Sequence, residues 1–264
     1  MSKLKLGLET YSVREAFQAD PLDTLKRIKE MGYKGVEMTL SLLKSRGEGV
    51  EPLPISFYKD ALAEVGLECY GILTSWADVQ EENIESTIAI GRELGSPLLA
   101  IGSVPLKLIA TAEEAKAAIL RMQEVSEIMR AEGFIMGYHN HESDHKHVIE
   151  DKSFFEHVFD NLDDDFIMFL DTGNAAAGGA DPIELIMKYP NRSPYLHVKG
   201  YSAAEGYLAY IGRDDIDWDK LIDVAVKVGG ARVLDVEFGK RGDYDPFERA
   251  KNGFDVVNAI ISAK

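Results

Sequence analysis

The sequence contains little cysteine and no long hydrophobic run. Its 264 residues include one cysteine, Cys69. An internal disulfide is therefore excluded, and we expect a buried thiol in a reducing compartment. No 18 consecutive residues are all apolar, and residues 1–5 lack the apolar core of a signal peptide. We therefore expect a soluble, cytoplasmic protein that does not bind membranes.

Positive charge is also scarce. Lysine and arginine total 29 against 45 aspartates and glutamates, a net charge of −16. Proteins bind nucleic-acid phosphates with Lys and Arg side chains that displace counterions, so nucleic acid is not an expected partner. No Gly-x-Gly-x-x-Gly follows a strand and no P-loop is present, which excludes the common nucleotide-binding motifs.

Short apolar runs alternate with longer amphipathic segments, roughly every 30 residues, a pattern typical of βα units and a parallel sheet. Eight strands are predicted, at Lys5–Glu9, Gly35–Met38, Leu67–Leu73, Leu98–Ile101, Phe134–His139, Ile167–Asp171, Tyr195–Lys199 and Arg232–Glu237.

Helix boundaries between these strands are marked by capping residues. Helices are expected to begin at Asp20-Pro21 and Asp181-Pro182, and a capping box at Thr111 opens a helix to about Ala131. Glycines that end the helices and lead into the next strand are Gly32, Gly66, Gly95 and Gly133.

Eight βα units favour a closed barrel over an open doubly wound sheet. We predict an α/β protein with one (β/α)8 TIM-barrel domain spanning residues 1–264, a normal length for this fold. No Pro-, Gly- or Ser-rich linker divides the chain. The segment Leu40 to Pro54 is expected to be a long loop at the catalytic face, where it can act as a lid.

Most of the later predicted strands end in a side chain that can bind a metal. These are His139, Asp171, His197 and Glu237, with His141 on the same side of the fifth strand as His139. Carboxylates with imidazoles suit one divalent metal such as Mn, Co, Zn, Fe or Mg, which the sequence does not distinguish. The alternative is a hydrogen-bonded polar network without metal.

Other polar residues in this region are interpreted as structural. His145, His147 and His157 are expected at the surface or in loops. Asp235 is expected to face the surrounding helices rather than the barrel interior.

Several strings match one family across nearly the whole chain. The sequence resembles the sugar phosphate isomerase/epimerase family, the xylose-isomerase-like barrels, in Gly7-Leu8-Glu9-Thr10-Tyr11-Ser12-Val13-Arg14, Asp20-Pro21, Gly32-Tyr33-Lys34-Gly35-Val36-Glu37, Tyr138-His139-Asn140-His141, Asp171-Thr172-Gly173-Asn174, His197-Val198-Lys199 and Gly212 with Ile216-Asp217-Trp218.

The resemblance implies a metal-dependent isomerase or epimerase of carbohydrate metabolism. It implies metal ligands at Asp171, His197 and Glu237, with His139 where the family usually has a glutamate. The expected reaction proceeds through an enediolate, formed by proton abstraction next to a metal-bound carbonyl. Glu237 and His141 are the predicted acid/base residues. Lys199 stabilises oxyanion charge or is a rim ammonium paired with an acid.

The expected substrate is a small sugar, keto-sugar or cyclitol. Asn174 and Arg213 are predicted substrate contacts, and Glu9, Tyr11 and Glu37 are predicted to line the pocket floor. Trp76 is interpreted either as a face on which a sugar ring stacks or as part of the core. Arg14 and Lys44 are too scattered for a phosphate clamp, which favours a non-phosphorylated substrate.

Three other functions remain open at this stage. The same site can serve a lyase or dehydratase acting on a keto-inositol or 3-keto-glycoside. A metal-dependent endonuclease for abasic DNA is opposed by the acidic composition. A sugar binder would keep the pocket without turnover. The oligomeric state is also open, and a homo-oligomer is one alternative.

Overall fold

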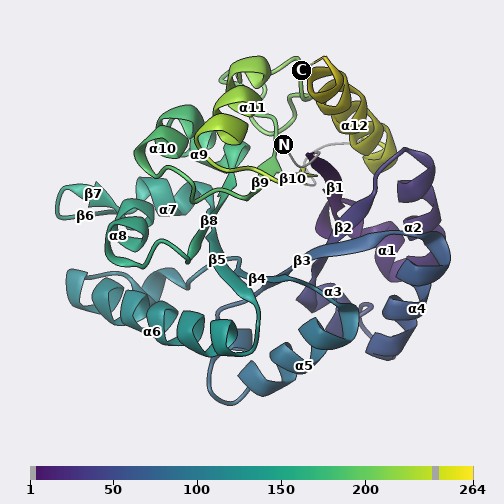
Figure 1. The fold of residues 1–264 in the computed structure, drawn as a ribbon, viewed down its shortest axis with the longest axis horizontal. Helices are drawn as coiled ribbons and strands as arrows, with labels where there is room; N and C mark the ends of the chain where they lie inside the picture. Colours follow the sequence, from purple (N-terminus) through teal and green to yellow (C-terminus); the bar gives the residue numbers. More distant parts are fainter. Residues whose placement is uncertain (1–3, 240–243, 264) are drawn as a thin grey trace.

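A closed parallel barrel lies at the centre of the molecule. The computed structural model describes residues 4–239 and 244–263. Around the barrel the described strands follow the order β1-β10-β9-β8-β5-β4-β3-β2, with the helices outside them (Figure 1). The barrel strands are β1 (Lys5–Glu9), β2 (Gly35–Thr39), β3 (Glu68–Thr74), β4 (Leu98–Ile101), β5 (Ile135–His139), β8 (Ile167–Asp171), β9 (Tyr195–Val198) and β10 (Val233–Val236). The predicted (β/α)8 TIM barrel is confirmed.

Helices follow every barrel strand. The α-helices are α1 (Arg14–Ala19), α2 (Pro21–Glu30), α3 (Leu40–Lys44), α4 (Ile55–Val65), α5 (Ile84–Leu94), α6 (Ala112–Ala131), α7 (Glu142–Lys146), α8 (Phe154–Asn161), α9 (Thr172–Ala177), α10 (Pro182–Lys188), α11 (Trp218–Lys227) and α12 (Pro246–Ser262). Short 3-10 helices are η1 (Thr10–Val13), η2 (Ala77–Val79) and η3 (Leu106–Leu108). A small antiparallel pair, β6 (Val148–Ile149) and β7 (Lys152–Ser153), projects beside α8 (Figure 1).

The sequence signals for helix ends act as expected. Asp20 and Asp181 each accept a backbone hydrogen bond at the start of α2 and α10, and the Thr111 capping box opens α6. Helix α4 ends at Gly66, whose φ of 73° lies in the left-handed region that glycine adopts without strain. These ends set the length of each connection and hence the start of the following strand.

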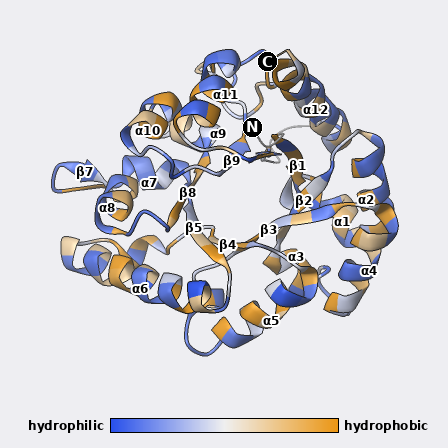
Figure 2. Ribbon diagram, viewed as in Figure 1, coloured by the Kyte–Doolittle hydropathy of each residue, from blue (hydrophilic) through white to orange (hydrophobic). Residues whose placement is uncertain are grey.

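Side-chain alternation divides the core into two parts. Val233, Tyr195 and Phe169 belong to a cluster inside the barrel, whereas Leu234 and Val236 pack with the helices outside. Hydrophobic residues dominate β5 and β8, and the helices carry both kinds (Figure 2). The same alternation directs polar side chains at the carboxyl ends of the strands inward.

One prediction about this alternation is wrong. Asp235 was expected to face the helices, but it lies inside the barrel and is 1% exposed. It shares a strand face with Val233, and its register partners are His197 on β9 and Gly7 on β1. A Cβ atom at Gly7 would lie 1.9 Å from Asp235 Oδ1, so only glycine leaves room for this inward carboxyl group.

The expected long loop after β2 is partly helical. Its first five residues form α3, which buries Leu40, Leu42 and Leu43. This helix was missed because one turn is too short to show periodicity. Strand limits differ from the prediction by at most one residue at either end, which is normal at fraying strand ends.

Among the residues that the structure describes, no helix is long and apolar enough to cross a membrane.

Candidate metal centre and active site

Four predicted ligands meet at the carboxyl-terminal mouth of the barrel. His139, Asp171, His197 and Glu237 each offer one ligand atom, and these atoms all lie within 4.8 Å of one another. They come from the ends of β5 and β8, from β9, and from the residue after β10. The first three side chains are buried, and Glu237 is half-buried.

The Asp171 carboxylate is held by the start of α9 and by the neighbouring strand. Its Oδ1 accepts from the Asn174 backbone N–H at 2.7 Å, and its Oδ2 accepts from the Asn174 side-chain amide at 2.9 Å. Asn140 forms two hydrogen bonds to the Asp171 backbone, at 2.7 and 3.1 Å. Asp171 therefore ends β8 and caps α9, and these hydrogen bonds hold its carboxylate in one orientation towards the other proposed ligands.

His197 on β9 lies between the carboxylates of Glu37, on β2, and Glu237, which follows β10. Its Nε2 contacts Glu37 Oε2 at 2.5 Å, and its Nδ1 is 2.6 Å from Glu237 Oε2. Burial alone would lower the pKa of His197, but Glu37 and Glu237 raise it well above the usual value. The contact with Glu37 fixes the ring orientation, as a carboxylate commonly does behind a metal-binding histidine.

One buried ligand atom in this group, His139 Nδ1, has no hydrogen-bond partner among the described residues. His197 Nδ1 and Glu237 Oε2 contact each other at 2.6 Å. Burial lowers the pKa of His139 well below its usual value, with His197 adding to the effect, so its imidazole is neutral. Leaving a buried polar atom unpaired costs free energy, and a divalent cation shared with His197 and Glu237 would satisfy His139 Nδ1. The donor set therefore fits the metal expected from the sequence.

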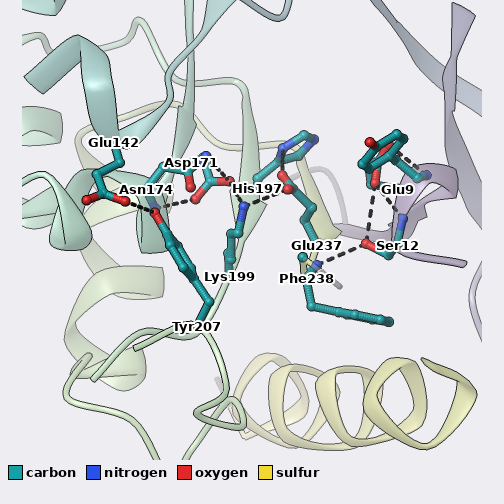
Figure 3. A network of polar contacts seen from close by, with 12 residues as sticks. Glu9, Ser12, Glu142, Asp171, Asn174, His197, Lys199, Tyr207, Glu237 and Phe238 are labelled. Atoms are coloured by element: carbon teal, nitrogen blue, oxygen red, sulfur yellow. Dashed lines mark hydrogen bonds and ion pairs between the residues drawn. The ribbon is translucent and has the colours of Figure 1, made fainter. Parts of the chain in front are cut away.

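Lys199 lies beside the ligands rather than at an exposed rim. Only 7% of it is exposed, and its Nζ donates to Glu237 Oε1 at 2.7 Å and to Asp171 Oδ2 at 3.2 Å (Figure 3). The two carboxylates outweigh burial and raise the lysine pKa. Burial would raise the pKa of Glu237, but Lys199 and His197 hold it well below its usual range.

Burial raises the pKa of Asp171 to about 8, although Lys199 opposes this effect. Repulsion between the Asp171 and Glu237 carboxylates adds to the effect of burial. A divalent cation would relieve that repulsion.

Two cavities open from this centre. The metal-side cavity, of about 620 Å³, is lined by residues that include Glu9, Tyr11, His139 and Glu237. The α7 cavity, of about 650 Å³, is lined by Leu106, His141, Glu142, Ser143, Lys146, His147, Asn174, Lys199, Tyr207 and Gly239. His141 and Lys199 line both cavities, and the ring of His141 lies 5.0 Å from that of His139.

The three residues predicted to line the pocket floor differ in their burial and in whether they line a cavity. Tyr11 is 44% exposed and lines the metal-side cavity. Glu9 also lines it, but its carboxylate accepts from the backbone N–H groups of Tyr11 and Ser12 and from Thr39 Oγ1. Glu37 is fully buried behind His197 and lines neither cavity.

The remaining predicted contacts are divided between the site and its surroundings. Asn174 lines the α7 cavity. Arg213 is exposed and lines neither cavity, and Trp76 packs against the hydrophobic core, as its alternative interpretation stated.

The structure also shows residues that sequence reasoning placed wrongly or missed. His145 was expected at the surface but is 7% exposed and contacts Asn140 at 3.0 Å, and burial lowers its pKa to about 4. Tyr207 donates to Glu142 at 3.1 Å across the α7 cavity. Neither His145 nor Tyr207 lies at the end of a strand. The pattern of strand-end side chains that identified the ligands could therefore not have found these two residues.

Solved structures of similar fold include several sugar-related proteins. A sugar phosphate isomerase/epimerase from Parabacteroides distasonis matches with a TM-score of 0.82 and 23% identity, over 99% of this chain and 96% of that one. D-allulose 3-epimerase from Methylomonas sp. matches with a TM-score of 0.72 and 14% identity, over 98% and 99%. L-ribulose 3-epimerase matches with a TM-score of 0.71 and 17% identity, over 100% and 95%.

At these identities the likeness concerns the fold. Comparison with curated proteins finds no match. A family model described as xylose isomerase-like TIM barrel matches residues 25–260, which is most of the sequence. The chain therefore belongs to the xylose isomerase-like TIM barrel family.

Proposed function

We propose that this protein is a divalent-metal-dependent isomerase or epimerase of a non-phosphorylated sugar or keto-sugar. The observation that carries the proposal is the meeting of four ligand atoms within 4.8 Å of one another, on His139, Asp171, His197 and Glu237, beside the Lys199 ammonium. The epimerases of similar fold support the class of reaction. One of them, the D-allulose 3-epimerase from Methylomonas sp., was solved in complex with D-allulose.

The ion would be held by His139, Asp171, His197 and Glu237. When bound, it supplies Lewis-acid polarisation of a carbonyl group, which acidifies the neighbouring C–H bond. The protein provides the other requirements of enolisation. The metal-side cavity receives the sugar next to these ligands, and the Lys199 ammonium provides positive charge where negative charge develops on the substrate oxygen.

Proton transfer is assigned to His141 and Glu237. Both side chains line the metal-side cavity, so each can reach a substrate carbon placed there. Imidazole and carboxylate are the side chains that most often act as general acid and base. Taking the proton with one group and returning it with the other gives epimerisation at one carbon or isomerisation between neighbours.

The charges around the metal-side cavity favour a substrate without phosphate. Among the described residues that line it, Lys44 is paired with Asp78 at 2.6 Å, and Lys199 is paired with Glu237 and Asp171. Both ammonium groups therefore already have carboxylate partners, whereas phosphate sites usually offer cations or a helix N-terminus without a competing acid.

Elemental analysis combined with deuterium exchange tests this proposal. Purified protein is expected to hold one divalent metal per chain and to introduce deuterium beside the carbonyl of ketoses or keto-inositols in D₂O, followed by NMR. The product distinguishes the two reaction types, since an epimer or isomer supports the proposal and a dehydrated product assigns the site to a lyase. A metal-free protein that exchanges no proton in any ketose would overturn it.

A further inference from the structure

The α7 cavity has no assigned role in a reaction at the metal. None of the four proposed ligands lines it among the described residues, yet it shares His141, Lys199 and Gly239 with the metal-side cavity. A substrate that reacts at the metal must place its reacting carbon in the metal-side cavity. The α7 cavity can therefore hold only a part of the substrate that lies beyond His141 and Lys199.

Its lining is suited to a neutral group that carries hydroxyls. Leu106 and Tyr207 provide apolar surface, while Ser143, Asn174 and Glu142 provide hydrogen-bonding groups. The Lys146 ammonium is paired with Glu142, which also accepts from the Tyr207 hydroxyl. The charges of Lys146 and Glu142 thus offset each other, which favours a polyhydroxylated ligand over a strongly charged one.

The two cavities are too large together for one sugar ring. Each, at about 620 and 650 Å³, lies within the range of roughly 300–1,000 Å³ that is typical of a complete small-molecule site. In Figure 3, Lys199 lies between Asn174 and Tyr207 on one side and Glu237 and His197 on the other. A ligand crossing from one cavity to the other must pass beside this ammonium and the His141 ring.

We propose that the α7 cavity is a second subsite that binds a neutral, hydroxylated substituent of the substrate. This inference rests on the proposed function and specifies its substrate class. The substrate is a two-part molecule, a keto-sugar or ketose glycosylated on one of its hydroxyls, with the reacting ring in the metal-side cavity. The oxygen that links the two parts lies between His141 and Lys199.

Calorimetric binding to the metal-loaded protein tests the subsite. The one-ring probe is D-fructose, and the two-ring probes are its glucosylated forms turanose, leucrose and isomaltulose, which differ in the position of the linkage. At least one two-ring probe is expected to bind tenfold or more tightly than D-fructose. Equal or weaker binding of all three overturns the subsite but leaves the proposed function standing, since that function is read separately from metal content and proton exchange.

Two matched variants locate the gain in affinity. Ser143 lines only the α7 cavity and Ser41 only the metal-side cavity, and both side chains are exposed. Ser143→Trp is expected to reduce the ratio of the affinity for the two-ring probe to the affinity for D-fructose to about one. Ser41→Trp is expected to weaken both probes and preserve the ratio. A ratio that survives Ser143→Trp would overturn the assignment to the α7 cavity, and unfolding curves verify that both variants fold.

Discussion

At the scale of single residues, Glu37 determines which nitrogen of His197 is available for a metal. Both side chains are fully buried, and the carboxylate contacts Nε2. That contact holds a proton on Nε2, so Nδ1, which faces Glu237 Oε2, is the nitrogen that would lose its proton to bind a metal. Glu37 thus acts through His197 rather than on the substrate, so we interpret it as a positioning residue.

Glu37→Gln is expected to weaken metal binding by about 10- to 100-fold, because the amide is a weaker acceptor and no longer favours this tautomer. Competition with a chromogenic chelator measures the affinity directly. Asp214→Asn is the control, since this half-buried carboxylate accepts from Trp218 and is not in contact with a proposed ligand. Unchanged affinity in the Glu37 variant would show that the contact does not orient His197.

His141 is expected to affect the rate without affecting the metal. It lies outside the group of four ligands but lines the same cavity. His141→Ala should lower the rate of deuterium exchange by about 10²- to 10⁴-fold, the usual contribution of a general acid or base. Metal content is measured on the same sample. His157→Ala serves as the control, because this side chain contacts the Ile149 carbonyl far from the mouth. Loss of metal in the His141 variant would make it a ligand instead.

At the scale of secondary-structure elements, one arginine joins the last helix to the active-site face. Arg249 on α12 is 5% exposed and donates to the carbonyl oxygens of Tyr207 at 3.1 Å and Ala209 at 2.8 Å. Its guanidinium also lies 4.6 Å from the ring centroid of Tyr244 and 4.9 Å from that of Tyr210. The segment between β9 and α11, which carries Tyr207, is therefore held by α12.

Arg249→Met is expected to lower the free energy of unfolding by on the order of 3 kcal/mol, because two buried carbonyl groups lose a charged donor. Urea denaturation measures the change. Arg130→Met is the matched control, since Arg130 forms an exposed ion pair with Asp165 and should change stability by less than about 1 kcal/mol. Similar losses in the two variants would mean that Arg249 does not anchor the segment.

At the scale of the whole molecule, the barrel brings acids from distant parts of the sequence into one interior. Glu9, Glu37, Asp171 and Asp235 are each at most 1% exposed. Burial and mutual repulsion raise the pKa of Glu9 to about 7 and that of Asp235 well above its usual value. Hydrogen bonds hold Glu9, Glu37 and Asp171, whereas neither carboxyl oxygen of Asp235 has a hydrogen-bond partner among the described residues.

Removal of metal is expected to destabilise the whole barrel, because an ion that binds only the folded state adds RT ln(1 + [ion]/Kd) to its stability. At 100 times Kd this contribution is about 2.7 kcal/mol. Scanning calorimetry of chelator-treated protein, titrated with Mn²⁺ and then Zn²⁺, should show a rising midpoint. The midpoint of the Asp171→Asn variant should rise less. An equal rise in that variant would mean that the stabilising ion binds at a site other than the four proposed ligands.

Much of the fold could be predicted because its signals are local. Gly66 and Thr111 mark helix ends through their own backbone and side-chain geometry, and the strands appear as short apolar runs. Helix α3 was missed because a single turn carries no repeat. Asp235 was placed on the wrong face, since its inward position depends on Gly7 of the neighbouring strand.

The sequence by itself determined the parallel barrel and the residues at the carboxyl ends of its strands, because both depend on periodicity and chain order. Only the tertiary structure decided what those residues touch. The contact between Glu37 and His197 joins positions 160 residues apart, and the Lys199 ammonium lies between Asp171 and Glu237. Arg213 and Trp76 stay outside both cavities, since closure of the barrel brings strand ends together but leaves residues further along the loops free to diverge.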